Sequence, residues 1–182
     1  MLLMSLFLAC SGPANLEGIE TETAEVQLVE QCATLQDRVI CDFDAINSAD
    51  EIALLSDLYG QPIVLDLSAG WCGPCKAAAS NLQATADLLP GVTFLTVLIE
   101  DAFGDIPDGS DLEIWANNYS ITTEPVWGAS RDIISQNPID MENHLFLSGW
   151  PTFYFIDSNG RLQEYIRGYD EATIIEKASA LD

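Results

Sequence analysis

The chain has 182 residues, a length typical of one domain, and 48% of them are hydrophobic while 19% are charged. This composition can bury a core, which excludes a wholly disordered or collagen-like chain. Acidic residues outnumber basic ones 29 to 6, for a formal net charge of −23, so we expect no nucleic-acid partner and no basic surface for anionic lipids. No stretch of about 18 apolar residues is present, so we expect no membrane-spanning helix.

The first nine residues, MLLMSLFLA, are uncharged and almost wholly apolar, and Cys10 follows them. A run this short is typical of a secretory signal. Leu6–Cys10 resembles the lipobox of bacterial lipoproteins, in which the cysteine is lipidated and becomes the mature N-terminus. Phe7 stands where that family has leucine, and no basic residue precedes the run. The resemblance implies export and a lipid anchor at Cys10, in the outer membrane if the cell has one, because Ser11 follows. A plain signal peptide with an incidental cysteine is the alternative.

Residues 11–30 differ in composition from the rest of the chain. They include five glutamates, no basic residue and no aromatic residue. Little in this segment could offset the entropy lost on ordering, so we expect a flexible acidic tether. The expected organisation is a signal and lipobox over 1–10, the tether over 11–30, and a folded domain over 31–182.

The five cysteines are Cys10, Cys32, Cys41, Cys72 and Cys75. With Cys10 assigned to the anchor and Cys72 paired with Cys75 as C-x-x-C, Cys32 and Cys41 remain for each other. Such a structural disulfide persists in an exported protein and would stabilise it by about 2–3 kcal/mol. A four-cysteine zinc site is the alternative, but the first pair lacks the spacing of a zinc knuckle. A single histidine excludes a histidine-rich metal site, and we expect no cofactor.

The pattern of the chain predicts helices and strands in alternation. Ser48–Glu51 matches a capping box, which predicts a helix from there to Gly60. Ile63–Leu67 is a short apolar run that predicts a central strand buried on both faces. Beyond Cys75, apolar residues at helical spacing predict a helix that ends at Pro90–Gly91; they are Ala78, Leu82, Ala86 and Leu89.

The second half continues this alternation. Val92–Ile99 predicts a strand, and Ser110–Glu113 matches a capping box before a helix with Trp115 and Tyr119. Thr152–Ile156 and Leu162–Ile166 predict a hairpin, after which Asp170 caps a last helix. The order of elements predicts an α/β fold with a mixed sheet.

The pentad Trp71-Cys72-Gly73-Pro74-Cys75 lies between the buried strand and a helix. Backbone N–H groups and the dipole at a helix N-terminus stabilise a thiolate, so Cys72 is the expected nucleophile. Only the thiolate attacks a disulfide. Cys75 is one helical turn further on and can resolve the mixed disulfide. Gly73 allows a partner chain to approach closely, and Pro74 removes an N–H group that a first turn leaves unpaired.

Two segments resemble thioredoxins: Ile63–Lys76, IVLDLSAGWCGPCK, resembles their active-site region, and Gly149–Gly160, GWPTFYFIDSNG, resembles their cis-proline signature. The likeness spans about residues 45 to 182. It implies a thioredoxin-like α/β fold, with a central mixed sheet flanked by helices, an N-terminal extension and an insertion before the cis-proline.

The resemblance carries three residue roles to this chain. Asp66 matches the buried acid that accepts a proton from the second cysteine, and burial should raise its pKa. Pro151 matches the cis-proline that faces the dithiol and binds an extended substrate. Trp71 flanks the nucleophile, where it could shield the disulfide and contact substrate. A partly exposed Asp66 and a purely structural Trp71 are the alternatives.

This chain also departs from the thioredoxin pattern. Ser68 stands where thioredoxins usually have an aromatic residue, and Trp150 stands where they have a small or β-branched one. Trp150 either reshapes the substrate groove or fills the core. Extra length between Tyr119 and Pro151 includes Ile121–Trp127 and Ile133–Met141. Such insertions are typical of exported, membrane-anchored relatives that maintain cytochrome c or other extracytoplasmic thiols.

These residues predict an exported enzyme that reduces protein disulfides through Cys72 and Cys75, supplied by a membrane electron donor or acceptor. An oxidase or isomerase is a second hypothesis. A redox-inert module that binds extended peptides along the cis-proline is a third, and the complete set of Cys72, Cys75 and Asp66 argues against it.

Overall fold

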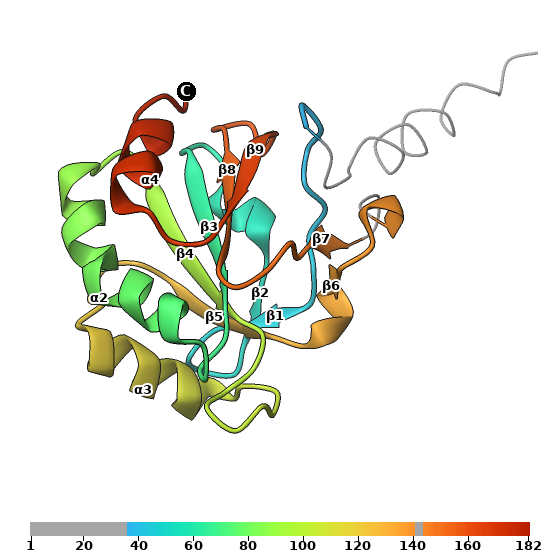
Figure 1. Ribbon diagram of the computed structural model, residues 1–182, viewed down its shortest axis with the longest axis vertical. Coiled ribbons are helices and arrows are strands. Elements are labelled where there is room, and N and C mark those ends of the chain that lie inside the picture. The colour runs from blue at the N-terminus through green and yellow to red at the C-terminus, as the bar shows by residue number, and fades with distance from the viewer. Residues whose placement is uncertain (1–35, 141–143) are drawn as a thin grey trace, which may run out of the picture. The chain divides into compact units, whose positions relative to one another are not determined.

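The structure is a computed structural model that describes residues 36–140 and 144–182. The predictions for the signal segment, Cys10, the tether and Cys32 lie outside these residues. The described part forms one seven-stranded sheet in the order β2-β1-β5-β4-β3-β8-β9 (Figure 1). Its strands are β1 (Ala45–Ile46), β2 (Ile52–Ala53), β3 (Ile63–Ser68), β4 (Thr93–Leu98), β5 (Val126–Ala129), β8 (Thr152–Ile156) and β9 (Leu162–Arg167).

Strand β3 lies at the centre of this sheet, and each of its six residues is buried. It pairs in parallel with β4, where Asp66 is opposite Thr96, and antiparallel with β8, where Leu67 is opposite Thr152. A strand that is covered on both faces needs a continuous apolar run, which explains the sequence of this segment. The prediction of a central strand is confirmed, as are the strands predicted over Val92–Ile99, Thr152–Ile156 and Leu162–Ile166.

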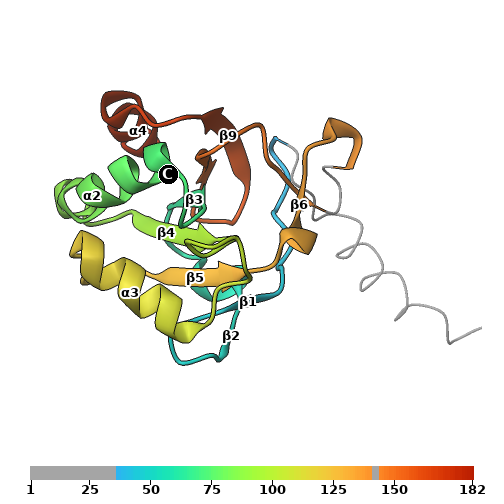
Figure 2. The same cartoon turned by 60° about the horizontal axis from the view of Figure 1, so that its bottom comes forward.

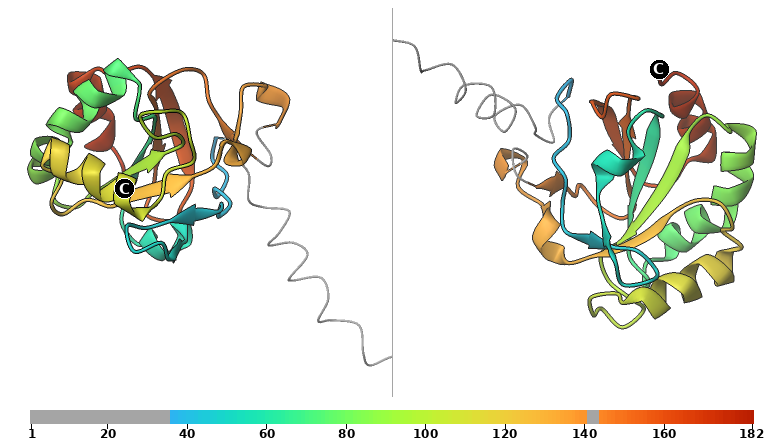
Figure 3. Two further views of the ribbon diagram at one scale, coloured as in Figure 1. Left: turned by 90° about the horizontal axis from the view of Figure 1, so that it is seen from below. Right: turned by 180° about the vertical axis from the view of Figure 1, so that it is seen from behind.

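Three helices cover one face of the sheet: α2 (Gly73–Leu88), α3 (Gly109–Tyr119) and α4 (Glu171–Ala178). They lie on the same side of the strands in every view (Figures 1 and 3). Leu82, Leu112 and Ile174, one from each helix, share an apolar cluster with Val64 and Phe153 of the sheet. In the described ranges, no helix has the length and apolar character needed to cross a membrane.

The opposite face is covered by short segments. They include a 3-10 turn, η1 (Leu55–Leu58), and the segment before Pro151, which forms η2 (Arg131–Ile133), β6 (Ile134–Ser135), η3 (Pro138–Asp140) and β7 (Leu145–Phe146). Strands β6 and β7 form their own two-stranded parallel sheet. Leu55, Ile133 and Leu145 belong to the apolar cluster of this face. The insertion therefore packs on the sheet, where the sequence pattern indicated only extra length.

The prediction of a helix from Ser48 to Gly60 is wrong. That segment is a hairpin of β1 and β2 followed by η1. Asn47 Oδ1 accepts hydrogen bonds from the backbone N–H groups of Ala49 at 2.9 Å and Glu51 at 3.1 Å. The backbone N–H and hydroxyl of Ser56 donate to the Asp42 carboxylate at 2.8 and 2.7 Å. These side-chain acceptors compete with the carbonyl groups that a helix would supply.

Two further predictions need correction. The helix after Ser110 exists, but Asp108 and Asp111, not Ser110 and Glu113, form its capping box. The Asp108 carboxylate accepts from the backbone of Ser110 and Asp111. Part of the supposed insertion Ile121–Trp127 belongs to the central sheet, because β5 begins at Val126 and lies between β4 and β1 (Figure 2).

Candidate active site

Cys72 is the N-cap of α2, and it forms a disulfide with Cys75. The Cα atoms are 5.3 Å apart, and Cys72 Sγ accepts a hydrogen bond from the Cys75 backbone N–H at 3.2 Å. Pro74 occupies the first turn, where its missing N–H group costs no helical hydrogen bond. Both cysteines are buried, while Gly73 and Pro74 between them are exposed. The exposed surface next to the disulfide is therefore the short rim formed by these two residues.

Asp66 lies on β3, and only 2% of it is exposed. Its Oδ2 accepts a 2.8 Å hydrogen bond from the Ser68 hydroxyl, and Ser68 is itself fully buried. Burial raises the pKa of the Asp66 carboxyl to about 7, and the hydrogen bond from Ser68 opposes that rise. The carboxyl can therefore take up and release a proton near neutral pH. Its side chain points to the sheet face that carries α2, on which Cys75 also packs.

The Trp150–Pro151 peptide bond is cis. Thr152, the next residue, pairs with Leu67 at the end of β3 from which the dithiol loop leaves, so Pro151 and this loop lie at the same end of adjacent strands. Trp71 and Trp150 meet edge to face, with ring centroids 5.8 Å apart. Trp71 is 45% exposed, whereas Trp150 is half-buried and packs against the clusters of both sheet faces. Trp150 thus contributes to both the core and the rim of the site.

Two residues that no sequence motif indicates, Glu100 and Arg131, hold Trp71 in place. The Trp71 indole N–H donates to Glu100 Oε2 at 2.6 Å, and Arg131 Nε forms an ion pair with Glu100 Oε1. The hydrogen bond from Arg131 is the main cause that lowers the pKa of Glu100. Glu100 follows β4 and Arg131 lies on the insertion, so no local motif connects them to the pentad. The contact of Glu100 with Trp71 and Arg131 follows from the order of strands in the sheet and not from a local motif.

The loop after β4 packs tightly against the dithiol loop. The Gly70 backbone N–H donates to the Glu100 carbonyl at 2.7 Å. A Cβ atom at Gly70 would lie 2.6 Å from the backbone carbon of Asp101, so this position has no room for a side chain. The close approach fixes Glu100 beside Trp71.

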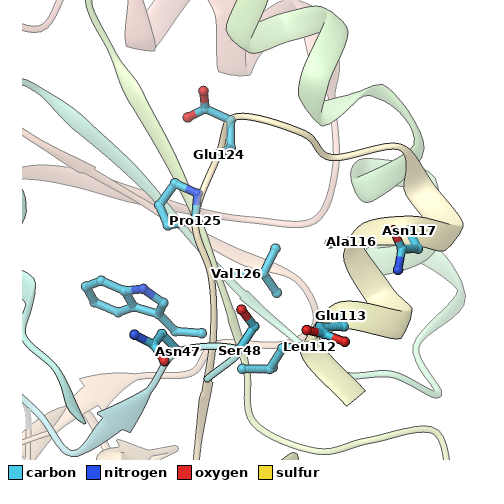
Figure 4. Close-up of a pocket in the computed structure, with 10 residues that line it drawn as sticks. Asn47, Ser48, Leu112, Glu113, Ala116, Asn117, Glu124, Pro125 and Val126 are labelled. Atoms are coloured by element: carbon cyan, nitrogen blue, oxygen red, sulfur yellow. The ribbon is translucent and has the colours of Figure 1, made fainter. Parts of the chain in front are cut away.

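A hollow of about 470 Å³ lies between β5 and α3 (Figure 4). Its lining includes Glu113 and Asn117 of α3 and Glu124 before β5, but neither cysteine nor Pro151. It is therefore separate from the dithiol. Within the described residues, no group of three or more His, Cys, Asp or Glu side chains could hold a metal ion.

Comparisons with known proteins agree with this geometry. A family model described as the AhpC/TSA family matches residues 37–165. The thiol-disulfide oxidoreductase ResA of Oceanobacillus iheyensis is 30% identical over 125 residues, which are 63% of this chain and 53% of that protein. A thioredoxin of Geodia cydonium is 25% identical over 129 residues, which are 71% of this chain and 88% of that protein.

The chain spans about half the length of that ResA protein, and its match covers 33% of the H-type thioredoxins of Ricinus communis and Nicotiana tabacum. Among solved structures, a DsbF homologue from Corynebacterium diphtheriae superposes with a TM-score of 0.62 at 16% identity. That superposition covers 79% of this chain and 87% of the other.

Proposed function

Because the chain belongs to the AhpC/TSA family of thioredoxin-like proteins, we propose that it exchanges thiols and disulfides with protein substrates through Cys72 and Cys75. The likeness to solved structures confirms the expected thioredoxin-like α/β fold. The observation that carries the proposal is the Cys72–Cys75 disulfide at the start of α2, at the same end of the sheet as cis Pro151 and on the face that buries Asp66.

The first chemical step belongs to Cys72. In the reduced enzyme, the N-terminus of α2 stabilises the Cys72 thiolate. This thiolate attacks one sulfur of a substrate disulfide, the Cys72–substrate bond forms, and the other substrate sulfur leaves as a thiolate that water protonates.

The second step belongs to Cys75 and Asp66. The Cys75 thiol gives its proton to the Asp66 carboxylate, and the new thiolate attacks Cys72 Sγ. The Cys72–Cys75 disulfide forms, the bond to the substrate breaks, and the second substrate sulfur leaves as a thiolate. The substrate gains two electrons, so a separate dithiol donor, which we place in the membrane, must reduce the enzyme again.

The exposed rim beside the dithiol is the proposed substrate surface. Trp71, Gly73 and Pro74 are exposed there, and Trp150 contacts Trp71 from the segment that precedes Pro151. An extended substrate strand would lie along Trp150 and cis Pro151, with its disulfide above Cys72. The proposed substrates are exported proteins, including apocytochromes.

The proposed direction is reduction, because the Gly-Pro pair between the cysteines resembles that of reducing thioredoxins. Equilibration of the chain with glutathione, followed by an insulin-reduction assay, tests this direction. We expect a potential near that of thioredoxin, about −270 mV, and turnover with insulin. A potential near about −120 mV would instead support the oxidase or isomerase hypothesis. If Cys72 and Cys75 do not equilibrate with glutathione at all, the hypothesis of a redox-inert peptide-binding module remains.

We further propose that the chain is exported and anchored through lipidated Cys10, with residues 11–30 as a tether for a domain over 31–182. The support is the lipobox-like run before Cys10 and the acidic composition that follows it. Mass spectrometry of the membrane fraction should find a mature chain that begins at lipid-modified Cys10. A soluble chain with another N-terminus would overturn the anchor without affecting the dithiol chemistry.

A further inference from the structure

The hollow between β5 and α3 opens on an edge of the central sheet. Four consecutive residues line it at the start of β5, from Glu124 to Trp127. The Val126 side chain packs in the apolar cluster of the face that carries the helices, whereas Trp127 packs in the cluster of the opposite face. Consecutive side chains of a strand point to opposite faces, so a space that touches both residues lies along the edge of the strand. The hollow therefore follows the backbone of β5.

The polar backbone groups of Val126 face this hollow. The Thr96 N–H donates to the Pro125 carbonyl at 3.1 Å, which directs the backbone of Pro125 toward β4. Successive residues of a strand direct their N–H and C=O groups to alternate sides, so those of Val126 point away from β4. Because the backbone of Pro125 faces β4, the N–H group that a proline lacks is not missing from the edge at the hollow.

No strand of the described residues pairs with Val126 on this side. Strand β1 pairs with β5 only at Gly128 and Ala129. The Asn47 N–H then donates to the Glu51 carbonyl at 2.9 Å, so the chain leaves β5 and turns into the hairpin of β1 and β2. An unpaired strand edge is a template on which a further strand can form.

The wall beside this edge is acidic. Glu113, Ala116 and Asn117 of α3 line the hollow next to the strand that carries Val126 (Figure 4). Glu113 and Asn117 are exposed, and Leu112 adds an apolar contact. Of the six basic residues of the chain, all of them described, none lines the hollow. The wall thus favours a long cationic side chain, with its aliphatic part on Ala116 and its charge near Glu113.

We propose that the edge of β5 at Val126 is a docking site for a partner protein, which adds an extended basic segment there as a further strand. The backbone of that segment bonds the N–H and C=O groups of Val126, and one of its lysine or arginine side chains lies on α3 against Glu113. Residues 11–30 of this chain are acidic, and a second copy carries the same net charge of −23. Both have the wrong charge for this wall, so the occupant is a different protein.

This docking site is distant from the dithiol along the strands. Glu124, just before β5, accepts a hydrogen bond from the Phe94 N–H at 2.7 Å, and Phe94 pairs with Val64 near the start of β3. The dithiol loop leaves the other end of β3, after Ser68. A segment bound along the start of β5 leaves the dithiol rim free, and the proposal does not depend on the thiol chemistry.

The test measures binding of a blocked, fluorescent peptide of alternating lysine and valine residues to the full chain by fluorescence anisotropy. One matched peptide has glutamate in place of lysine. Another keeps every lysine but is N-methylated at alternate backbone positions, so it cannot pair as a strand. Hydrogen exchange of the ¹⁵N-labelled chain follows the Val126 N–H. We expect that only the unmodified lysine peptide binds at low salt, and that it slows exchange at Val126.

Two variants with the same net charge separate a local contact from general attraction. Glu113→Lys should weaken binding of the lysine peptide about tenfold, because repulsion replaces attraction at the wall. Glu176→Lys makes the same change at an exposed residue of α4 that does not line the hollow, and it should bind about as tightly as the wild type.

Equal binding of the lysine peptide and its N-methylated form would overturn strand addition, as would equal affinities of the two variants. A Val126 N–H that is protected from exchange before any peptide is added would also overturn the proposal, because this chain or a second copy would then cover the edge. Insulin reduction by the wild type tests the dithiol chemistry separately, and its failure would leave the docking site standing.

Discussion

The Ser68 hydroxyl donates a 2.8 Å hydrogen bond to Asp66 Oδ2, and both side chains are buried in the centre of the sheet. Ser68 stands where an aromatic side chain was expected from the thioredoxin pattern. The substitution brings a hydrogen-bond donor to a carboxyl that burial otherwise keeps protonated. Burial and this hydrogen bond together set the pH range in which the Asp66 carboxyl would act as the proposed base.

Replacement of Ser68 by alanine should raise the pKa of Asp66 further. A hydrogen bond to a charged group is worth about 1.5–3 kcal/mol, so a rise of at least about one pH unit is expected. The pH profile of mixed-disulfide resolution should shift upward by the same amount. Thr96→Val is the control, because Thr96 is the buried strand neighbour of Asp66 and no hydrogen bond joins them among the described residues. An unshifted profile in Ser68→Ala would contradict the role of this pair.

Asp66 should make stability depend on pH. Its pKa is about 7 in the folded protein, against 3.8 for an unperturbed aspartate side chain such as that of the unfolded chain, so the folded state binds the proton more tightly. The stability that this proton contributes is fully present below pH 3.8 and is lost as the pH rises toward 7. The loss is on the order of 4 kcal/mol.

Asp66→Asn removes this dependence, because asparagine does not ionise. Urea unfolding at pH 5 and pH 8 should show a variant that gains stability relative to the wild type at the higher pH. Mixed disulfides of this variant should resolve slowly at both pH values. The prediction is wrong if the stability difference between variant and wild type is the same at the two pH values.

Arg131→Met should loosen Trp71 without unfolding the domain. The Arg131–Glu100 pair is partly exposed, so its loss should cost less than about 1 kcal/mol. Because Arg131 lowers the pKa of Glu100, the pH midpoint of the Trp71 indole NMR signal should rise in the variant. We also expect KM for a protein substrate to rise more than kcat falls. Arg161→Met, which removes a hydrogen bond to the Asp37 carbonyl, should leave the indole signal unchanged.

Cys32 and Cys41 should remain paired when the active-site disulfide is reduced. Cys41 is half-buried in the segment before β1, and Cys32 lies outside the described residues. Mild reductant followed by alkylation and mass spectrometry should label Cys72 and Cys75 first. Labelling of all four thiols in the native protein would contradict a structural disulfide.

The parts of the fold that the sequence predicted well have strong local patterns. The short apolar run of β3 is bounded by turn residues, which favours a strand, and the 3.6-residue spacing of apolar residues in α2 favours a helix. The sequence after Ser48 matches a capping box, but these residues form a turn in which Asn47 and Asp42 accept the backbone hydrogen bonds. The Asn47 bonds are local, whereas Asp42 and Ser56 lie 14 positions apart in the chain.

In the candidate site, too, residues in local motifs could be predicted and residues brought in by tertiary contacts could not. Cys72, Cys75, Asp66 and Pro151 belong to continuous motifs, so the sequence could identify them. Glu100 and Arg131 reach the site from two separate segments, and only tertiary structure brings them there. The departure at Ser68 was visible in the sequence, but its contact with Asp66 was not.

The most direct test of the proposed chemistry compares Cys72→Ser with Cys75→Ser in cells. Cys75→Ser leaves Cys72 able to attack a disulfide but removes the thiol that releases the substrate, so covalent mixed disulfides should accumulate. Cys72→Ser should form none, because Cys75 lies buried one turn into α2. Mass spectrometry of the captured adducts would also identify the substrates. Absence of adducts from Cys75→Ser, together with unchanged insulin reduction in both variants, would contradict the oxidoreductase function.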